Sequence, residues 1–351
     1  MNRSNKRLLI VLLITTLAMP CTGCKKFIQQ VIDMVSNGGG SGGFPPGGGS
    51  ILPPNIGTSF PPPPGMGTQP PTTVAPPTNP GNQTPPNNQT PPATNPETIP
   101  PLVDSNVPFF KYPKQRENRK NHGPRFDDYE THCPQRFGTQ YWDRDAMTHA
   151  HETTHGINSD IRNNYNRTGR KANGFYCGND RGLVLVEPNI RIRHARAYIP
   201  SSLRGMRYNL YLVQQSAWDD CPLYIFDELV AYTNGGEVGV DMAKRGNLNK
   251  NCDGVRGALE FTVYAAAIAM ATAAHDPKYF EEYKPFRAFL KWSLARAMTV
   301  HYAGRNLPQF SGYNQAQYLE TLRKGPEAEN MRTFLKKACG EDWFNKVIMG
   351  Q

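Results

Sequence analysis

The chain has 351 residues, of which 38% are hydrophobic, and its 39 Lys and Arg against 29 Asp and Glu give a formal net charge of +10. This length leaves room for a sizeable hydrophobic core and makes disulfide staples unnecessary. The basic balance favours anionic lipid, cell-wall polymers or acidic proteins as partners. We expect no nucleic acid partner, because the basic residues form no recognisable binding motif.

The first 24 residues have the pattern of an export signal. Arg3, Lys6 and Arg7 precede an apolar run from Leu8 to Met19, which is too short for a comfortable membrane span. The pattern predicts that the rest of the chain lies outside the cytoplasm.

Gly23-Cys24 ends this signal and resembles the bacterial lipobox, in which a cysteine after a small residue is lipidated and becomes the mature N-terminus. The resemblance implies a lipid on Cys24, followed by a short mature segment at residues 25–36. Cys21 stands where a lipobox usually has leucine, so simple secretion is the alternative. The expected location is therefore the bacterial cell envelope, as a membrane-anchored lipoprotein, or otherwise the medium.

Residues 37–107 have the composition of a linker. They hold 20 of the 32 prolines, begin with Gly-rich repeats and contain no Lys or Arg. Such a segment cannot build a core, so we expect it to be disordered or polyproline-like. It would hold a catalytic head away from the membrane, or serve only as a spacer.

Residues 108–351 are predicted to form one folded domain, with 34 Lys and Arg against 26 Asp and Glu. The periodicity of their apolar residues predicts a mostly α (α+β) fold with a small sheet near the functional site. Downstream of that site, helical patterns cover 257–274, 277–283, 285–302, 316–322 and 328–338.

Residues 151–155 read His-Glu-Thr-Thr-His and match the zinc-hydrolase signature H-E-x-x-H. Residues four apart share a face of a helix, so His151 and His155 can offer two imidazole nitrogens to one metal ion. Glu152 lies beside them as the general base for a zinc-bound water. Asp143 and Asp145 are candidate caps of this helix. The alternative is a pair of surface histidines on an amphipathic helix.

Two strands are predicted after the motif. Gly182–Pro188 is a β-branched and leucine-rich run, and Asn189–Arg193 alternates isoleucine with arginine. In the second strand Arg191 and Arg193 would share one face. That face would favour acidic substrates, or would only protect a sheet edge from aggregation.

A catalytic zinc ion needs a third protein ligand. The metzincin extension of the motif fails, because Asn158 and Ile161 occupy its Gly and His positions. Glu228 is the best candidate, since it lies in an apolar helical segment where an unpaired carboxylate would be costly to ionise. Glu260 and Asp160 are the alternatives.

The remaining acids of the domain are expected in other settings. Glu130 lies upstream of the motif, Glu187 follows a strand, Glu237 is expected in a Gly-rich loop, and Asp227 is expected to pair with an arginine or to lie on a rim.

H-E-x-x-H followed about 70–80 residues later by E-x-x-A-Y resembles the gluzincin metallopeptidases, including the group of anthrax lethal factor. The resemblance covers the two motif helices and the segment between them, not the whole chain. It implies a zincin-like metallopeptidase domain with three zinc ligands and one base that also shuttles the proton. The matching positions are His151, His155 and Glu228 as ligands, Glu152 as base, and Ala231 and Tyr232.

Two tyrosines each lie one helical turn from Glu228. Either the Tyr224 or the Tyr232 phenol could face the site and stabilise an oxyanion, or each is simply packed with its hydroxyl bonded nearby. Ala231 is small enough to let the two metal-bearing helices approach closely.

The other histidines and the cysteines are less informative. His149 is expected at the surface or behind a ligand, and His301 near the end of a helix could donate to the site. The domain has five cysteines, and the pairs to test first are Cys133 with Cys177 and Cys221 with Cys252.

The sequence predicts a zinc metalloendopeptidase that hydrolyses peptide bonds outside the cytoplasm, with Zn²⁺ as cofactor and a protein or peptide as substrate. The alternative is a non-catalytic cell-envelope protein that binds a partner through the same fold. Glu152 favours catalysis, because a binding scaffold would need no base at that position.

Overall fold

The computed structural model of the chain describes residues 106–118, 121–135, 145–248 and 252–351. The export signal, Cys24, the linker up to residue 105 and Asp143 lie outside the described residues, so the predictions made for them stay predictions. The described part consists mostly of α-helices, together with one three-stranded antiparallel sheet. This agrees with the predicted mostly α (α+β) class.

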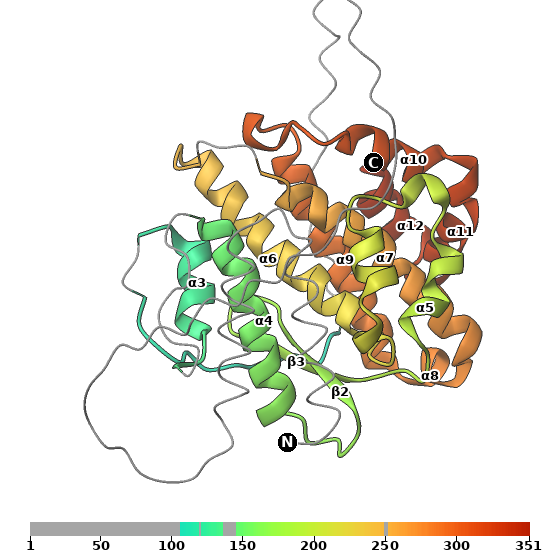
Figure 1. The fold of residues 1–351 in the computed structure, drawn as a ribbon, viewed down its shortest axis with the longest axis horizontal. Helices are drawn as coiled ribbons and strands as arrows, with labels where there is room; N and C mark the ends of the chain where they lie inside the picture. Colours follow the sequence, from blue (N-terminus) through green and yellow to red (C-terminus); the bar gives the residue numbers. More distant parts are fainter. Residues whose placement is uncertain (1–105, 119–120, 136–144, 249–251) are drawn as a thin grey trace, which may run out of the picture. The chain divides into compact units, whose positions relative to one another are not determined.

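Helices α3 and α4 lie between β1 and β2 in the sequence, and the other helices of the described part follow β3 (Figure 1). The helices predicted between residues 257 and 338 correspond to α7 through α11, with ends that differ by at most three residues from those predicted. In chain order the elements are β1 (Phe110–Lys111), α3 (Pro124–His132), α4 (Ala146–Asn164), β2 (Ala172–Tyr176), β3 (Arg181–Val186), α5 (Ile192–Ala195), α6 (Tyr224–Lys244), α7 (Gly254–His275), α8 (Pro277–Glu282), α9 (Lys284–Gly304), α10 (Gln315–Lys324), α11 (Glu329–Cys339) and α12 (Glu341–Phe344).

The sheet has the strand order β1-β3-β2. Gly182 of β3 lies opposite Phe110 of β1 and also opposite Tyr176 of β2, so the strand predicted from residue 182 is the central one. The turn between β2 and β3 carries positive φ angles at Gly178, Asn179 and Asp180. Asn and Asp tolerate this left-handed region better than other non-glycine residues, which explains why they can follow the glycine here.

The second predicted strand, over residues 189–193, is wrong. Its alternating residues instead enter α5, whose first residue is Ile192. The backbone is held by acids outside the segment, since the Asn189 N–H donates to Asp276 and the Arg193 N–H donates to Asp219. Arg193 also approaches Asp219 with its side chain at 3.3 Å, so the arginine is not a free edge charge.

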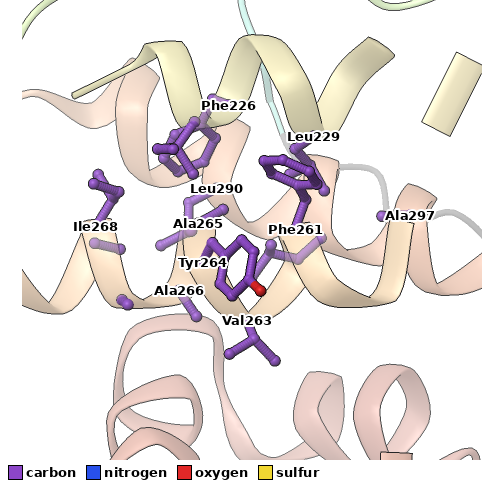
Figure 2. Close-up of a cluster of buried hydrophobic side chains, with 14 of the residues drawn as sticks. Phe226, Leu229, Phe261, Val263, Tyr264, Ala265, Ala266, Ile268, Leu290 and Ala297 are labelled. Carbon is purple, nitrogen blue, oxygen red and sulfur yellow. The ribbon is translucent and has the colours of Figure 1, made fainter. Parts of the chain in front are cut away.

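Helices α6, α7 and α9 share the largest core. Phe226 and Leu229 of α6 lie against the apolar residues of α7 around Phe261 and Tyr264, and Leu290 of α9 joins them (Figure 2). Helix α7 is long and apolar enough to cross a membrane, but 89% of its most apolar window is buried. We therefore interpret α7 as a buried core helix, as its small residues predicted.

Glycines inside α6 bring this helix against α4. A Cβ atom on Gly235 would lie 2.9 Å from the Met147 carbonyl oxygen, and one on Gly239 would lie 2.8 Å from the Met147 sulfur. The prediction that Glu237 lies in a Gly-rich loop is wrong, because the glycines belong to the helix interior. They are tolerated there despite their low helix propensity because the backbones of the two helices need the space.

All five cysteines of the domain are free thiols, so neither predicted disulfide forms. Cys177 and Cys252 are buried in two different hydrophobic clusters, whereas Cys221 is half-buried. Burial raises the pKa of the Cys177 thiol to about 12 and that of Cys221 to about 11. Both thiols are therefore protonated and unreactive near neutral pH.

Candidate metal centre

Helix α4 presents the two motif histidines on one face. Its N-terminus is capped by Asp145, whose side chain accepts a hydrogen bond from the Thr148 N–H, as predicted for that residue. The Nε2 atoms of His151 and His155 lie 3.1 Å apart, and both rings are largely buried. Two nitrogen lone pairs this close repel each other unless a proton or a metal ion lies between them.

Helix α6 brings Glu228 to the same point. Its Oε2 atom lies 3.7 Å from Nε2 of His151 and 3.5 Å from Nε2 of His155. The Glu228 side chain is only 3% exposed, and among the described residues this Oε2 atom has no hydrogen-bond donor. A buried carboxylate oxygen without a donor is costly, so a positive charge at this position, on an imidazole or on a metal ion, would stabilise the site.

The three distances test whether zinc fits. A tetrahedral zinc ion with bonds of about 2.0–2.1 Å places its ligand atoms about 3.3–3.4 Å from one another. The separations of 3.1, 3.5 and 3.7 Å lie around this value. Two imidazole nitrogens and one carboxylate oxygen are also the ligand types of catalytic zinc sites, in which a fourth position stays open.

Residues behind the ligands fix their orientation. Asp227 is buried and accepts a hydrogen bond of 2.6 Å from Nδ1 of His155, and Asn158 donates to the same carboxylate oxygen at 3.0 Å. The expectation that Asp227 pairs with an arginine or lies on a rim is therefore wrong. A carboxylate behind a metal-bound imidazole holds Nε2 in the form that binds metal.

The two histidines differ in their affinity for a proton. Burial and the neighbouring His155 lower the pKa of His151 well below its ordinary value. Burial acts in the same direction on His155, but Glu228 and Asp227 outweigh it and raise the pKa of His155 well above the ordinary value. The negative potential of the two acids thus attracts one positive charge to the point between the imidazoles.

The Glu152 carboxylate lies next to the same point. It is 7% exposed, and a carboxylate oxygen lies within 4.8 Å of the ligand nitrogens of both histidines. From this position the Glu152 carboxylate is able to accept a proton from a water molecule bound to a metal ion between the histidines.

The two predicted tyrosines lie at the site but have different contacts. The Tyr224 hydroxyl donates to Oε1 of Glu228 at 2.7 Å, and its ring stacks on Trp218 with centroids 4.4 Å apart. The Tyr232 ring contacts the His151 ring edge-on at 4.4 Å. Burial raises the pKa of Tyr232 to about 12, although the nearby Arg207 opposes this, so the phenol is a neutral donor at neutral pH.

Two further residues at the site were not predicted from the sequence. The Tyr211 hydroxyl lies 3.5 Å from the Tyr232 hydroxyl, and the Arg207 guanidinium lies over the Tyr232 ring. Both belong to the segment before α6, which contains the short helix η4 (Asn209–Gln214) and carries no motif. Only the richness in tyrosine of residues 208–211 distinguished it.

The alternative third ligands are bound elsewhere in the domain. The Glu260 carboxylate accepts from Arg207 and Arg256, and the Asp160 carboxylate accepts from the Tyr112 hydroxyl and from Asn164. Both oxygens of each of these carboxylates therefore already have hydrogen-bond partners, unlike Oε2 of Glu228.

The other residues considered from the sequence also have structural partners. His149 is buried rather than at the surface, and its Nε2 atom lies 2.6 Å from Glu130. His301 is buried against the Val255 carbonyl, and burial lowers its pKa to about 3. Glu187 accepts from the Leu223 N–H, and burial raises its pKa to about 8.

A second group of potential ligands lies at α3. Asp128, His132 and Asp180 each offer a donor atom within 4.8 Å of the others. However, Nδ1 of His132 faces Asp128 at 3.3 Å while Nε2 faces Asp180 at 2.8 Å. A metal ion would need both acids near the same nitrogen, so we interpret His132 as a charged side chain that connects α3 to the β2–β3 turn.

We expect His132→Gln to destabilise the protein strongly below pH 6.5 and much less at alkaline pH. Burial alone would lower the pKa of His132, but Asp128 and Asp180 raise it above the ordinary value of 6.5. A group with a raised folded pKa contributes its full stabilisation below the unfolded pKa and loses it as the pH rises through the folded pKa. Denaturant unfolding of both proteins across this range measures the difference. A difference independent of pH would show that His132 is not charged in the folded protein.

Compared with known proteins, the chain matches no family model, no curated protein and no solved structure.

Proposed function

We propose that residues 108–351 form a zinc-dependent metalloendopeptidase of the gluzincin type, with a zincin-like fold. One observation carries this proposal. His151, His155 and the unpaired oxygen of Glu228 converge on a point that a cation would stabilise, and Glu152 lies beside it. The two imidazole nitrogens and the carboxylate oxygen, and the distances between these atoms, fit a zinc site.

The residues around this point supply the steps of peptide hydrolysis. His151, His155 and Glu228 would hold a zinc ion, which would polarise the scissile carbonyl and make a water molecule more acidic. Glu152 accepts the proton of the attacking water and transfers it to the leaving amine, so that water and a peptide bond give a carboxylic acid and an amine. Asp227 holds His155 in place, and Tyr224 holds Glu228.

Tyr232 is the better oxyanion donor of the two predicted tyrosines. The Tyr224 hydroxyl is already bonded to Glu228, whereas the Tyr232 hydroxyl lies 3.5 Å from the Tyr211 hydroxyl and beside the Arg207 side chain. A neutral phenol near the centre can donate to the oxygen that becomes negative as the carbonyl is attacked.

Metal removal tests the proposal directly. The full-length protein is expected to hydrolyse a generic unfolded protein, to lose this activity with a zinc chelator, and to regain it when zinc is added back. Metal content and cleavage are measured on the same samples. A zinc-loaded protein that cleaves none of a varied set of unfolded proteins, yet binds one partner, would support the envelope-scaffold alternative instead.

We also propose that the enzyme is exported and tethered by a lipid on Cys24, with the proline-rich linker between the anchor and the domain. The Gly23-Cys24 pattern after the apolar signal supports this. Cys24→Ser is expected to release the protein from the membrane fraction or to block its processing. If membrane partitioning and mass are unchanged in this variant, Cys24 carries no lipid and the uncleaved signal is the anchor.

A further inference from the structure

A buried arginine lies against the proposed oxyanion donor. Arg207 precedes the short helical segment η4 (Asn209–Gln214), and its side chain is 9% exposed. The Cζ atom of its guanidinium lies 4.6 Å from the centroid of the Tyr232 ring. A cation at this distance from an aromatic face attracts the ring and restricts its position.

The guanidinium is bound to acids of the protein itself. Its N–H groups donate to Glu260 at 3.1 Å and, through a short contact, to Asp253. Arg256 also donates to Glu260, so the cluster contains two cations and two anions. Because its charge is balanced within this cluster, Arg207 is suited to holding its neighbours in place.

Other contacts also restrict the position of the Tyr232 ring. Phe261 stacks on it with centroids 4.9 Å apart and planes at 20°. A Cβ atom on Gly257 would lie only 2.3 Å from the ring, so a side chain at 257 would displace it. The ring edge then meets His151, which fixes the phenol beside the metal centre.

Arg207 also orients the second phenol. The Tyr211 N–H donates to the Arg207 carbonyl at 3.0 Å, so the two residues belong to one helical turn. Fixing Arg207 to α7 through Asp253 and Glu260 therefore also fixes Tyr211, whose hydroxyl lies 3.5 Å from that of Tyr232.

We propose that Arg207 is a positioning residue for peptide hydrolysis, which holds the Tyr232 phenol, with Tyr211 beside it, where the oxyanion forms. This inference rests on the proposed function. It assigns a role in the reaction to a segment that carries no motif and to an ion-pair cluster of α7 that would otherwise be purely structural.

A double-mutant cycle on the zinc-loaded full-length protein tests the role. Arg207→Met is expected to lower kcat by about 10–10²-fold with little change in KM, since an oxyanion donor acts in the transition state and its loss costs about 10²–10³-fold. In the Tyr232→Phe background, Arg207→Met should then lower kcat by no more than about 2–3-fold. Arg207→Lys, which keeps the charge, should recover part of the loss.

Arg256→Met is the matched control. It removes a cation from the same cluster and from the same Glu260 carboxylate, but Arg256 lies over Tyr318 and not over Tyr232. We expect kcat of this variant to stay within about threefold of wild type, because the lost contact lies away from the phenol. If Arg207→Met lowers kcat equally with and without the Tyr232 hydroxyl, or if Arg256→Met matches it, the effect is one of general stability and the proposal is overturned.

A crystal structure of zinc-loaded Arg207→Met provides a measurement that does not depend on activity. The Tyr232 ring is expected to turn away from His151 in the variant while the zinc ligands keep their places. A ring that stays in its wild-type position would overturn the positioning role. An inactive wild type with the ring displaced in the variant would instead contradict the proposed function and leave the positioning of Tyr232 by Arg207 intact.

Discussion

Glu152→Gln is expected to keep the zinc ion and the fold and to lose nearly all hydrolysis. The amide has the size of the carboxylate but cannot accept the proton of the attacking water at neutral pH. General base catalysis contributes about 10²–10⁴-fold in rate, so the loss lies far outside the error of a cleavage assay. Zinc content, thermal unfolding and cleavage of an unfolded protein are measured together on both proteins.

Glu187→Gln is a suitable control for this experiment. Glu187 is another buried carboxyl of the domain, and burial raises its pKa to about 8, so it is mostly protonated at neutral pH and an amide replaces it with little change in charge. The variant should cleave at nearly the wild-type rate. Full activity in Glu152→Gln would mean that another group takes the proton, and our assignment of the base would be wrong.

Replacing Glu228 should remove the metal ion. Both Glu228→Ala and the isosteric Glu228→Gln remove the only negatively charged side chain among the three proposed ligands. Zinc occupancy should therefore fall from about one per chain to a small fraction of that value. Addition of zinc should raise the unfolding temperature of the wild type but not of the variants, because only a state that binds the ion is stabilised by it.

Asp160→Asn is the matched control for the third ligand. Asp160 is a buried acid on α4 near the motif, yet its carboxylate is bonded to Tyr112 and Asn164 rather than directed at the histidines. This variant should keep its zinc even if it is less stable. If zinc remains in Glu228→Gln and is lost in Asp160→Asn, the carboxylate ligand is Asp160 and the proposed centre must be redrawn.

The site residues that could be predicted from the sequence are those recognisable by their spacing along a helix or by an acid in an apolar helix. The spacing of His151 and His155 places both side chains on one helical face. Glu228 could be identified because a charged carboxylate in an apolar helix is costly without a partner. Such patterns are local, so a single sequence is enough to predict them. The structure adds that these side chains lie within a few ångströms of one another.

Tertiary contacts decided the features that could not be predicted. Arg207 and Tyr211 lie at the centre because the chain before α6 folds back onto Tyr232. Asp227 points inward because Nδ1 of His155 donates a hydrogen bond to it. The alternation of residues 189–193 predicted a strand. In the structure Asp219 and Asp276, from other parts of the chain, bind the backbone N–H groups of this segment instead.

The close approach of α4 and α6 also provides a means of recognising relatives of this chain. Ala231, Gly235 and Gly239 follow Glu228 by three, seven and eleven residues, so they form a stripe of small residues on the same face as the carboxylate. At Gly235 the clearance to the α4 backbone leaves no room for even one methyl group without a shift. A distant homologue that keeps the proposed metal ligands and the same approach of the two helices is expected to keep this stripe too. The pattern of an acid followed by small residues at these intervals therefore remains searchable after the rest of the sequence has diverged.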